Sequence, residues 1–258
     1  MRTAVVTGAA QGVGLATASL LAALGYHVVL TDIQPLDRHL GRLTMMGYAA
    51  SALRGDVSSE TFVQQLAARL AADHGGTDVL VNNAGISMIA PAEETTAAQW
   101  QRVMDVNLFG PFLLSKYLGA QMLQRRSGSI INVASVAGLG GVSHRSAYNA
   151  SKHGLIGLTR TLAGEWGGRG VRVNAVCPGW IKTEMDVADQ STGAYSDQDI
   201  VNRVPMARFA RPEDVAQAIA FLADSAKSGF VNGVSLPVDG GWTADASWDS
   251  LRVRARTS

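Results

Sequence analysis

The sequence predicts an α/β fold in which a doubly wound parallel sheet of about seven strands carries helices on both faces. Short apolar runs alternate with helical stretches along most of the chain, as is typical of strands joined by crossover helices. The chain has 258 residues, of which 47% are hydrophobic, so it can bury one substantial core. We therefore expect a single domain with its ligand site beyond the carboxyl ends of the strands.

The expected elements follow in order from these runs. Strands are predicted near residues 3–7, 28–32, 49–54, 78–82, 129–134, 171–176 and 234–238. Helices are predicted near residues 13–24, 59–73, 96–105, 108–124, 147–166 and 212–223. The stretch after Asp32 is short and contains Pro35, so we expect only an abbreviated helix there. Right-handed crossovers would make all the strands parallel.

The turn after the first predicted strand is rich in glycine. Its sequence is Gly8-Ala-Ala-Gln-Gly12-Val-Gly14, and an apolar helical run follows through Leu24. A turn of this kind lets a pyrophosphate approach the backbone and lie at the helix N-terminus. The spacing differs from the commoner Gly-x-Gly-x-x-Gly. The pattern predicts a dinucleotide phosphate site.

An acidic residue ends the second predicted strand. A carboxylate at Asp32 can accept hydrogen bonds from the ribose hydroxyls of adenosine and would repel a 2′-phosphate. Gln11 and Ile33 occupy positions at which a basic residue would favour that phosphate. Arg38 is a nearby cation that could swing toward it. The sequence therefore favours NAD over NADP.

A tyrosine and a lysine with helical spacing provide a candidate general base. Tyr148 and Lys152 are four residues apart, so they share one face of a helix. Free tyrosine has a pKa of about 10, and holding it as phenolate at pH 7 costs roughly 4 kcal/mol. A cation about 4 Å away, at an effective dielectric of about 20, supplies attraction of about that size. Ser135, at the end of the apolar run 129–135, would add a hydroxyl donor.

With these motifs in this order, the chain resembles the short-chain dehydrogenase/reductase family, whose sheet is of the Rossmann type. The resemblance covers nearly everything from Thr3 to Trp242. It also rests on three further motifs: Asn82-Asn83-Ala84-Gly85, Pro178-Gly179-x-Ile181-x-Thr183 and Val238-Asp239-Gly240-Gly241.

The resemblance implies a role for each of these residues. Asn107 would anchor a proton-relay water and complete a catalytic tetrad with Ser135, Tyr148 and Lys152. Asp56 would contact the adenine of the cofactor; the alternative is that it is only a turn residue. The implied cofactor-binding residues are Gly8, Gln11, Gly12, Val13, Gly14, Asp32, Ile33, Asp56, Val57, Asn83, Ala84, Gly85, Tyr148, Lys152, Pro178, Gly179, Ile181 and Thr183.

The substrate walls are expected in the segments that begin at Ser87, Val136 and Trp180. Arg145, three residues before Tyr148, either faces the pocket or is a surface charge at the helix start. A guanidinium facing inward would suit a carboxylate, a sulfonate or a diol. The candidate substrate contacts are Ser135, Tyr148, His144, Arg145, Met88, Trp180 and Met185.

These residues predict an NAD-dependent oxidoreductase that interconverts a secondary alcohol and a ketone. The expected substrate is small and polar: a sugar, a sugar acid, a polyol or a hydroxy acid. The alternative is an NADPH-dependent carbonyl reductase, such as a 3-oxoacyl thioester reductase. A regulatory protein on the same fold would tolerate a broken tetrad, but all four residue types are present here.

Charge and composition bound the remaining partners. The net charge of +1 gives no reason to expect nucleic acid or a membrane surface. No apolar run reaches about 18 residues, and Met1-Arg2 leads directly into the first strand, so we expect a cytoplasmic protein without a signal peptide. Cys177 is the only cysteine, which excludes an intramolecular disulfide, and no metal site is expected. The family resemblance implies a homotetramer that shares the helices at 108–124 and 147–166.

We divide the chain into an NAD-binding and catalytic domain, residues 1–242, and a C-terminal extension, residues 243–258. A frayed terminus is the default expectation for such an extension. Trp242 and Trp248 argue instead that part of it packs, either on this chain or on another subunit. Some members of the resembling family bind a divalent ion through a carboxylate near this point, and the extension puts that feature in doubt.

Overall fold

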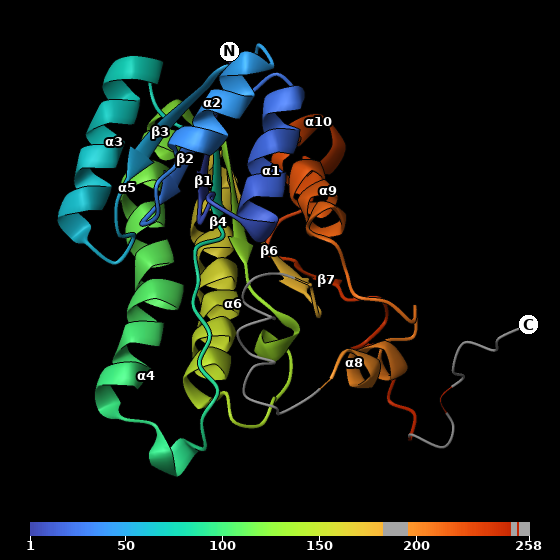
Figure 1. The fold of residues 1–258 in the computed structure, drawn as a ribbon. Helices are drawn as coiled ribbons and strands as arrows, with labels where there is room; N and C mark the ends of the chain where they lie inside the picture. Colours follow the sequence, from blue (N-terminus) through green and yellow to red (C-terminus); the bar gives the residue numbers. More distant parts are fainter. Residues whose placement is uncertain (183–195, 249–251, 253–258) are drawn as a thin grey trace, which may run out of the picture.

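The fold is a single seven-stranded parallel sheet with helices on both faces (Figure 1). The computed structural model describes residues 1–182, 196–248 and 252. The strand order is β3-β2-β1-β4-β5-β6-β7, so the direction of winding reverses between β1 and β4. This arrangement confirms the predicted doubly wound fold and places a ligand crevice at the reversal point.

The seven predicted strands are all present. Val5 and Leu80 at the centre of the sheet are fully buried, as apolar strands covered on both faces should be. The strands are β1 (Thr3–Thr7), β2 (His27–Asp32), β3 (Ala50–Arg54), β4 (Val79–Asn82), β5 (Gly128–Val133), β6 (Val171–Pro178) and β7 (Ser235–Val238).

Two helical layers bury two large cores against the sheet, and a smaller cluster, which includes Leu155 and Cys177, lies between α6 and β6. Leu21 and Ile219 belong to the core under α1, α2 and α9, whereas Leu66 and Leu118 belong to the core under α3, α5 and α6. The helices are α1 (Gly12–Ala23), α2 (Asp37–Met45), α3 (Glu60–His74), α4 (Ala97–Met104), α5 (Gly110–Arg125), α6 (Ser146–Trp166), α8 (Asp197–Arg203), α9 (Pro212–Ala223) and α10 (Ser225–Ser228). The expected abbreviated helix after Asp32 is α2, with nine residues. The short helices α8 and α10 were not predicted, because so few residues show no periodic pattern.

The expected break between two helices near residues 105–108 is wrong. A π-helical turn, Asp105–Phe109, joins α4 to α5 without interruption. Pro111 has no N–H to donate to the carbonyl four residues earlier, so a regular α-helical ladder cannot pass this point. A wider turn accommodates the proline, and such turns occur often at functional sites. It buries Val106 and Asn107.

A chain of buried amides holds α6 in register with the sheet. The Asn82 Nδ2 donates to Asn132 Oδ1 at 2.8 Å, and the Asn132 Nδ2 donates to Thr159 Oγ1 at 2.8 Å. These residues lie on β4, β5 and α6, and all three are buried. The bonds therefore fix the position of the Tyr148 helix relative to the carboxyl ends of the central strands.

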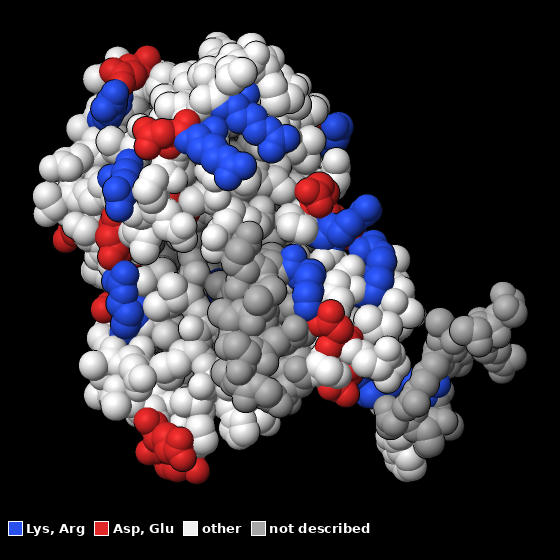
Figure 2. Space-filling view, viewed as in Figure 1, with Lys and Arg blue, Asp and Glu red and all other residues white. Residues whose placement is uncertain are grey.

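The described surface gives little sign of a single charged face. Figure 2 shows Lys and Arg side chains interspersed with Asp and Glu side chains over the visible part, in keeping with the net charge of +1. Among the described helices, none combines the length and apolar character needed to cross a bilayer.

Candidate active site

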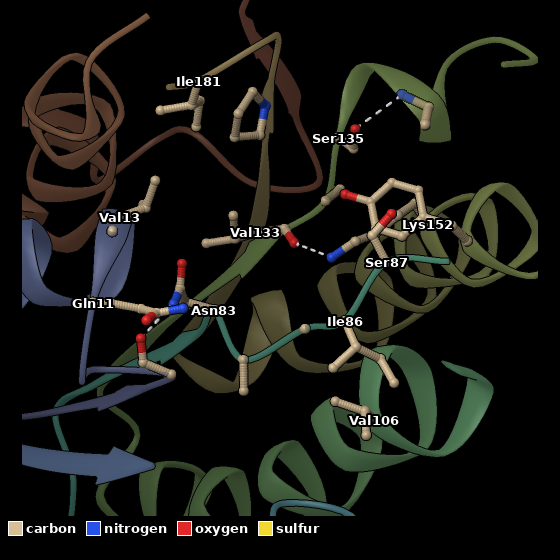
Figure 3. A pocket seen from close by; sticks show the side chains of 18 of the residues that line it. Gln11, Val13, Asn83, Ile86, Ser87, Val106, Val133, Ser135, Lys152 and Ile181 are labelled. Atoms are coloured by element: carbon tan, nitrogen blue, oxygen red, sulfur yellow. Dashed lines mark hydrogen bonds between the residues drawn. The ribbon is translucent and has the colours of Figure 1, made fainter. Parts of the chain in front are cut away.

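A cavity of about 560 Å³ lies at the carboxyl ends of the strands (Figure 3). Its walls come from the segments that follow β1, β2, β3, β4, β5 and β6, and from the start of α6. Most of the predicted cofactor residues line it: Gly8, Gln11, Gly12, Val13, Asp32, Ile33, Asp56, Val57, Asn83, Ala84, Gly85, Tyr148, Lys152, Pro178, Gly179 and Ile181. Gly14 lies behind this lining, and Thr183 falls outside the described residues.

The glycine-rich turn needs its glycines for backbone geometry and close packing. Gly8 and Gly12 have positive φ angles, +64° and +53°. A Cβ on Gly14 would lie 2.0 Å from the Gly8 carbonyl oxygen, so only glycine lets the first turn of α1 pack here. The α1 N-terminus has no side-chain cap and no acidic residue in its first turn. Its N–H groups are therefore available to an anionic group such as a pyrophosphate.

Asp32 joins the second strand to this turn. Its side chain is buried, and the carboxylate accepts hydrogen bonds from the backbone N–H groups of Ala10 (3.0 Å) and Gln34 (2.9 Å). Each carboxylate oxygen can accept more than one hydrogen bond, so the group can still receive ribose hydroxyls. The carboxylate thus both orders the phosphate turn and lines the cavity where an adenosine would lie.

Asp56 is held by a partner that the sequence did not reveal. Its carboxylate accepts from Ser58 and forms an ion pair of 2.9 Å with Arg102, which also lines the cavity. Burial alone would raise the pKa of Asp56, but the hydrogen bonds from Ser58 and Arg102 together lower it. Arg102 lies on α4, and no motif connects it with Asp56 in the sequence. The Asp56 carboxylate is therefore fixed as an anion beside the cavity.

The structure brings Tyr148 and Lys152 together on one face of α6. Lys152 is almost fully buried; its Nζ donates to the Val133 carbonyl at 2.8 Å and lies 5.6 Å from the Tyr148 ring centroid. Figure 3 shows this lysine pointing across the cavity floor toward β5. Burial lowers the pKa of the Lys152 ammonium to about 8. The Lys152 ammonium is thus held next to the Tyr148 phenol, and its lost hydration costs free energy.

Ser135 follows β5 and lines the same cavity. Its backbone is extended, and its Oγ accepts a hydrogen bond from the Ala137 N–H at 3.1 Å. This bond begins the short 3₁₀ turn Val136–Gly138 and fixes the direction of the hydroxyl group. The hydroxyl proton remains a donor for an oxygen atom in the cavity.

Asn107 supports the site from behind. In the π turn it is fully buried, its Oδ1 accepts from the Ile86 N–H, and its Nδ2 donates to the Ile86 carbonyl, both at 2.9 Å. A Cβ on Gly85 would lie 3.3 Å from Asn107 Oδ1 and 3.5 Å from Lys152 Nζ, so these two polar groups flank Gly85. Asn107 thereby fixes the segment after β4; its role in carrying a proton through water remains a prediction.

Arg145 lies in the cavity wall rather than on the surface. Only 8% of it is exposed, and it lines the cavity with Tyr148 and Trp180. Its Nη1 donates to Ser87 Oγ at 2.6 Å, and its guanidinium lies over the Tyr148 ring at 6.0 Å and the Trp180 ring at 5.5 Å. Between the two positions that the sequence left open, the structure places it inside.

Two other predicted substrate contacts, His144 and Met88, lie outside the cavity lining. His144 is exposed and lies outside the cavity lining, because its backbone is left-handed (φ +61°) and the chain turns there before α6. Met88 is half-buried and does not line the cavity, since the chain leaves the wall after Ser87. Met185 falls outside the described residues. The structure therefore gives no support to His144 or Met88 as substrate contacts.

Comparison with known proteins gives matches over nearly the whole chain. A family model described as enoyl-(acyl carrier protein) reductase matches residues 8–243. The chain is 44% identical to cis-4-hydroxycyclohexanecarboxylate dehydrogenase of Sinomonas cyclohexanicum, covering 94% of this chain and 97% of that protein. It is 40% identical to a 3-oxoacyl-[acyl-carrier-protein] reductase of Synechocystis, covering 92% and 95%.

A solved structure also matches over nearly the whole chain. It is described as an NAD(P)-dependent gluconate 5-dehydrogenase from Beutenbergia cavernae with bound NADP at low occupancy. The TM-score is 0.90 at 40% identity, covering 95% of this chain and 97% of that one. The extent of these matches establishes that the chain belongs to the short-chain dehydrogenase/reductase family. It is an oxidoreductase fold whose relatives act on CH–OH groups with a nicotinamide nucleotide.

Proposed function

We propose that this protein is an NAD-dependent oxidoreductase that interconverts a secondary alcohol and a ketone on a small polar substrate. The observation that carries the proposal is a buried lysine beside Tyr148 in a cavity that also contains Ser135. An ammonium in this position favours the phenolate form of the neighbouring tyrosine. Relatives named for a hydroxycyclohexanecarboxylate and for gluconate support a small polar substrate.

The residues of the cavity fit a dinucleotide. The open N-terminus of α1 would hold the pyrophosphate, Asp32 the adenosine ribose, and Asp56 the adenine edge. Bound NAD+ would supply the acceptor for the hydride of the carbinol carbon. Lys152 would hold the nicotinamide ribose, and Pro178, Gly179 and Ile181 would contact the nicotinamide end.

The chain's own residues would manage the proton and the substrate oxygen. The Tyr148 phenolate takes the proton of the substrate hydroxyl, and Lys152 stabilises its charge before that transfer. Ser135 donates a hydrogen bond to the substrate oxygen and so orients the carbinol carbon. General-base catalysis of this kind contributes typically about 10²–10⁴-fold to the rate. Asn107 would support the water chain that carries the proton outward.

A 3-oxoacyl thioester reductase that uses NADPH is the second candidate. The Synechocystis relative favours it, and so does the NADP bound in the solved neighbour. Arg54 ends β3 in register with Asp32, but its Nε donates to the Ile33 carbonyl at 2.7 Å, so its position favours neither candidate. A screen with NAD+ across sugar acids, polyols and hydroxy acids, run beside reduction of an acetoacetyl thioester with NADPH, separates the two candidates. Efficient thioester reduction without alcohol oxidation would support the second.

Replacing the proposed base tests the chemistry. Tyr148→Phe should lower kcat by at least about 10²-fold, because it removes the proton acceptor and leaves the ring in place. The affinity for NADH, measured by fluorescence titration, should stay close to that of the parent protein. Lys152→Ala should weaken both turnover and NADH binding, since the lysine also serves the cofactor. A Tyr148→Phe protein that keeps a large share of its activity would exclude the tyrosine as the base.

Cofactor choice can be tested at Asp32. NAD+ should exceed NADP+ by at least about tenfold in kcat/KM, roughly 1.4 kcal/mol, because the carboxylate repels a 2′-phosphate. Asp32→Ala should lower the ratio of kcat/KM with NAD+ to kcat/KM with NADP+. Arg54→Gln serves as the control, and it should change the ratio by less than about twofold, since Arg54 is bonded to a backbone carbonyl. Equal efficiencies in the parent enzyme would contradict the assignment to NAD.

We also propose that the protein is a homotetramer built on α5 and α6, with a second interface near the closing strand. Phe109 and Phe112 are exposed by 44% and 42% and stack at 6.1 Å where the π turn meets α5, and Phe230 is fully exposed before β7. Exposed aromatic side chains of this kind favour subunit contacts. Light scattering at micromolar concentration should give four times the chain mass. A monomer would contradict the proposal.

A further inference from the structure

Arg145 and Trp180 in the cavity wall begin a stack of cations and aromatic rings that continues behind the wall. The guanidinium of Arg145 lies 5.5 Å over the Trp180 ring, and the Trp180 and Trp242 rings are 5.8 Å apart. The guanidinium of Arg203 in turn lies 4.5 Å over the Trp242 ring. Contacts of this kind orient planar groups as well as attracting them. The wall therefore connects a buried cavity cation to residues that follow β7.

The C-terminal extension closes this stack with an ion cluster. The carboxylate of Asp245 lies 3.7 Å from Arg203 Nη1 and 3.4 Å from Arg252 Nε. The Arg203 Nη2 donates to the carbonyls of Trp242 (3.3 Å) and Asp245 (3.1 Å). The three charged side chains are only 20–23% exposed, so they are screened less than surface pairs. Figure 1 shows the described start of the extension, residues 243–248, near α8, which carries Arg203.

Backbone contacts hold the same unit together. The Trp180 carbonyl accepts from the Ala210 N–H at 2.9 Å, and the Met206 N–H donates to the Gly240 carbonyl at 3.1 Å. A Cβ on Gly240 would lie 2.7 Å from a Val204 methyl group, so the closing turn packs tightly under the segment after α8. Movement of the closing turn would therefore reach Trp180 through both the ring contact and the backbone.

We propose that Arg145 binds the carboxylate of a hydroxy-acid substrate, and that the C-terminal extension holds this cation in place through Asp245, Trp242 and Trp180. This inference rests on the proposed oxidation of a secondary alcohol and adds the substrate class. Asp245, Arg203 and Trp242 are positioning residues, because they act on the substrate only through the wall.

The chemistry of Arg145 suits a carboxylate. A guanidinium carries its N–H donors in a planar fork that matches the two oxygens of a carboxylate, and the Nη1 of Arg145 donates to Ser87 Oγ. Ser87 and the Trp180 ring fix the plane and direction of the fork. The ring of Tyr148, the proposed base, is 6.0 Å from the guanidinium carbon. One small molecule can therefore place its carbinol at Tyr148 and its carboxylate, several bonds away, at Arg145.

A matched pair of substrates tests the role of Arg145. We would compare 4-hydroxycyclohexanecarboxylate with its primary amide, which keeps the shape and removes the charge. Arg145→Gln should lower the ratio of kcat/KM for the acid to that for the amide by at least tenfold, mainly through KM for the acid. Equal losses for acid and amide, or none, would overturn the inference. A parent enzyme that oxidises other alcohols but does not prefer the acid would also overturn it and leave the proposed function intact. Failure with every alcohol would overturn the proposed function itself.

The positioning role of the extension is tested on the same ratio. Asp245→Asn and Trp242→Phe should each lower the acid-to-amide ratio of kcat/KM by three- to tenfold, while the affinity for NADH stays that of the parent. Asp73→Asn, which breaks the exposed pair with Arg69 on α3, is the control and should leave the ratio unchanged. The double variant Arg145→Gln/Asp245→Asn should lower the ratio no further than Arg145→Gln alone, because Asp245 acts through that cation. Additive losses, or equal effects on acid and amide, would overturn the positioning role.

Near-UV circular dichroism identifies any variant that has lost its tertiary structure. Coupling between the Trp180 and Trp242 rings should weaken in Trp242→Phe, whereas Asp73→Asn should keep the parent spectrum. Thermal unfolding of each variant shows whether the domain is intact. An intact Asp245→Asn protein with the parent acid-to-amide ratio would also overturn the proposed positioning.

Discussion

The candidate site depends on one constraint: the ammonium of Lys152 is buried next to the ring of Tyr148. A charged group in this position is unfavourable for folding, because it has lost most of its water. The Val133 carbonyl, at 2.8 Å, supplies one fixed acceptor in place of that water. The neighbouring backbone must leave room as well, and a Cβ on Gly138 would lie 2.8 Å from the Lys152 carbonyl oxygen. Gly138 therefore lets the turn after β5 pack against the α6 backbone at Lys152, and the Val133 carbonyl holds the ammonium itself.

The parts of the fold that surround this cation explain how the cavity is divided. At one end, the open α1 N-terminus and Asp32 form a region suited to a nucleotide. At the other end, Arg145 and Trp180 form a wall suited to a substrate. Lys152 lies between the two regions, on the cavity floor. The amide chain through Asn132 keeps α6, and with it this lysine, in a fixed relation to both ends.

Features governed by local sequence were predictable. The glycine turn, the carboxyl ends of the strands and the four-residue spacing of Tyr148 and Lys152 each depend on neighbouring residues, and the structure has them as expected. The orientation of Arg145 was not predictable, because it depends on a parallel bridge between Arg145 and Ala90 and on Ser87, more than fifty residues away. The π turn was missed because a proline can break a helix or widen it.

Long-range partners account for the other omissions. Arg102 and Asp56 are forty-six residues apart, and no spacing rule connects them. His144 looked like a partner of Arg145 because it is adjacent in sequence, but adjacent residues rarely point the same way in a turn. The two tryptophans at 242 and 248 suggested that part of the extension packs, and Trp242 does pack, whereas Trp248 is 78% exposed. The sequence could not show that the packing would reach the cavity wall.

The most direct test of the central constraint is the thermal stability of Lys152→Met against that of the parent protein, both without nucleotide, as pH is raised from 7 to 10. The pKa of Lys152 is lowered to about 8 in the folded protein, against 10.5 when it is unperturbed. Between these values the unfolded chain binds more protons than the folded one, so the stability of the parent should rise with pH. Because the parent carries a buried cation below pH 8 that the Lys152→Met variant lacks, the variant should have the higher Tm there.

This difference in Tm between variant and parent should shrink as pH rises from 8 to 10. A variant less stable at pH 7, or a difference in Tm that does not change with pH, would contradict a buried and costly charge beneath Tyr148.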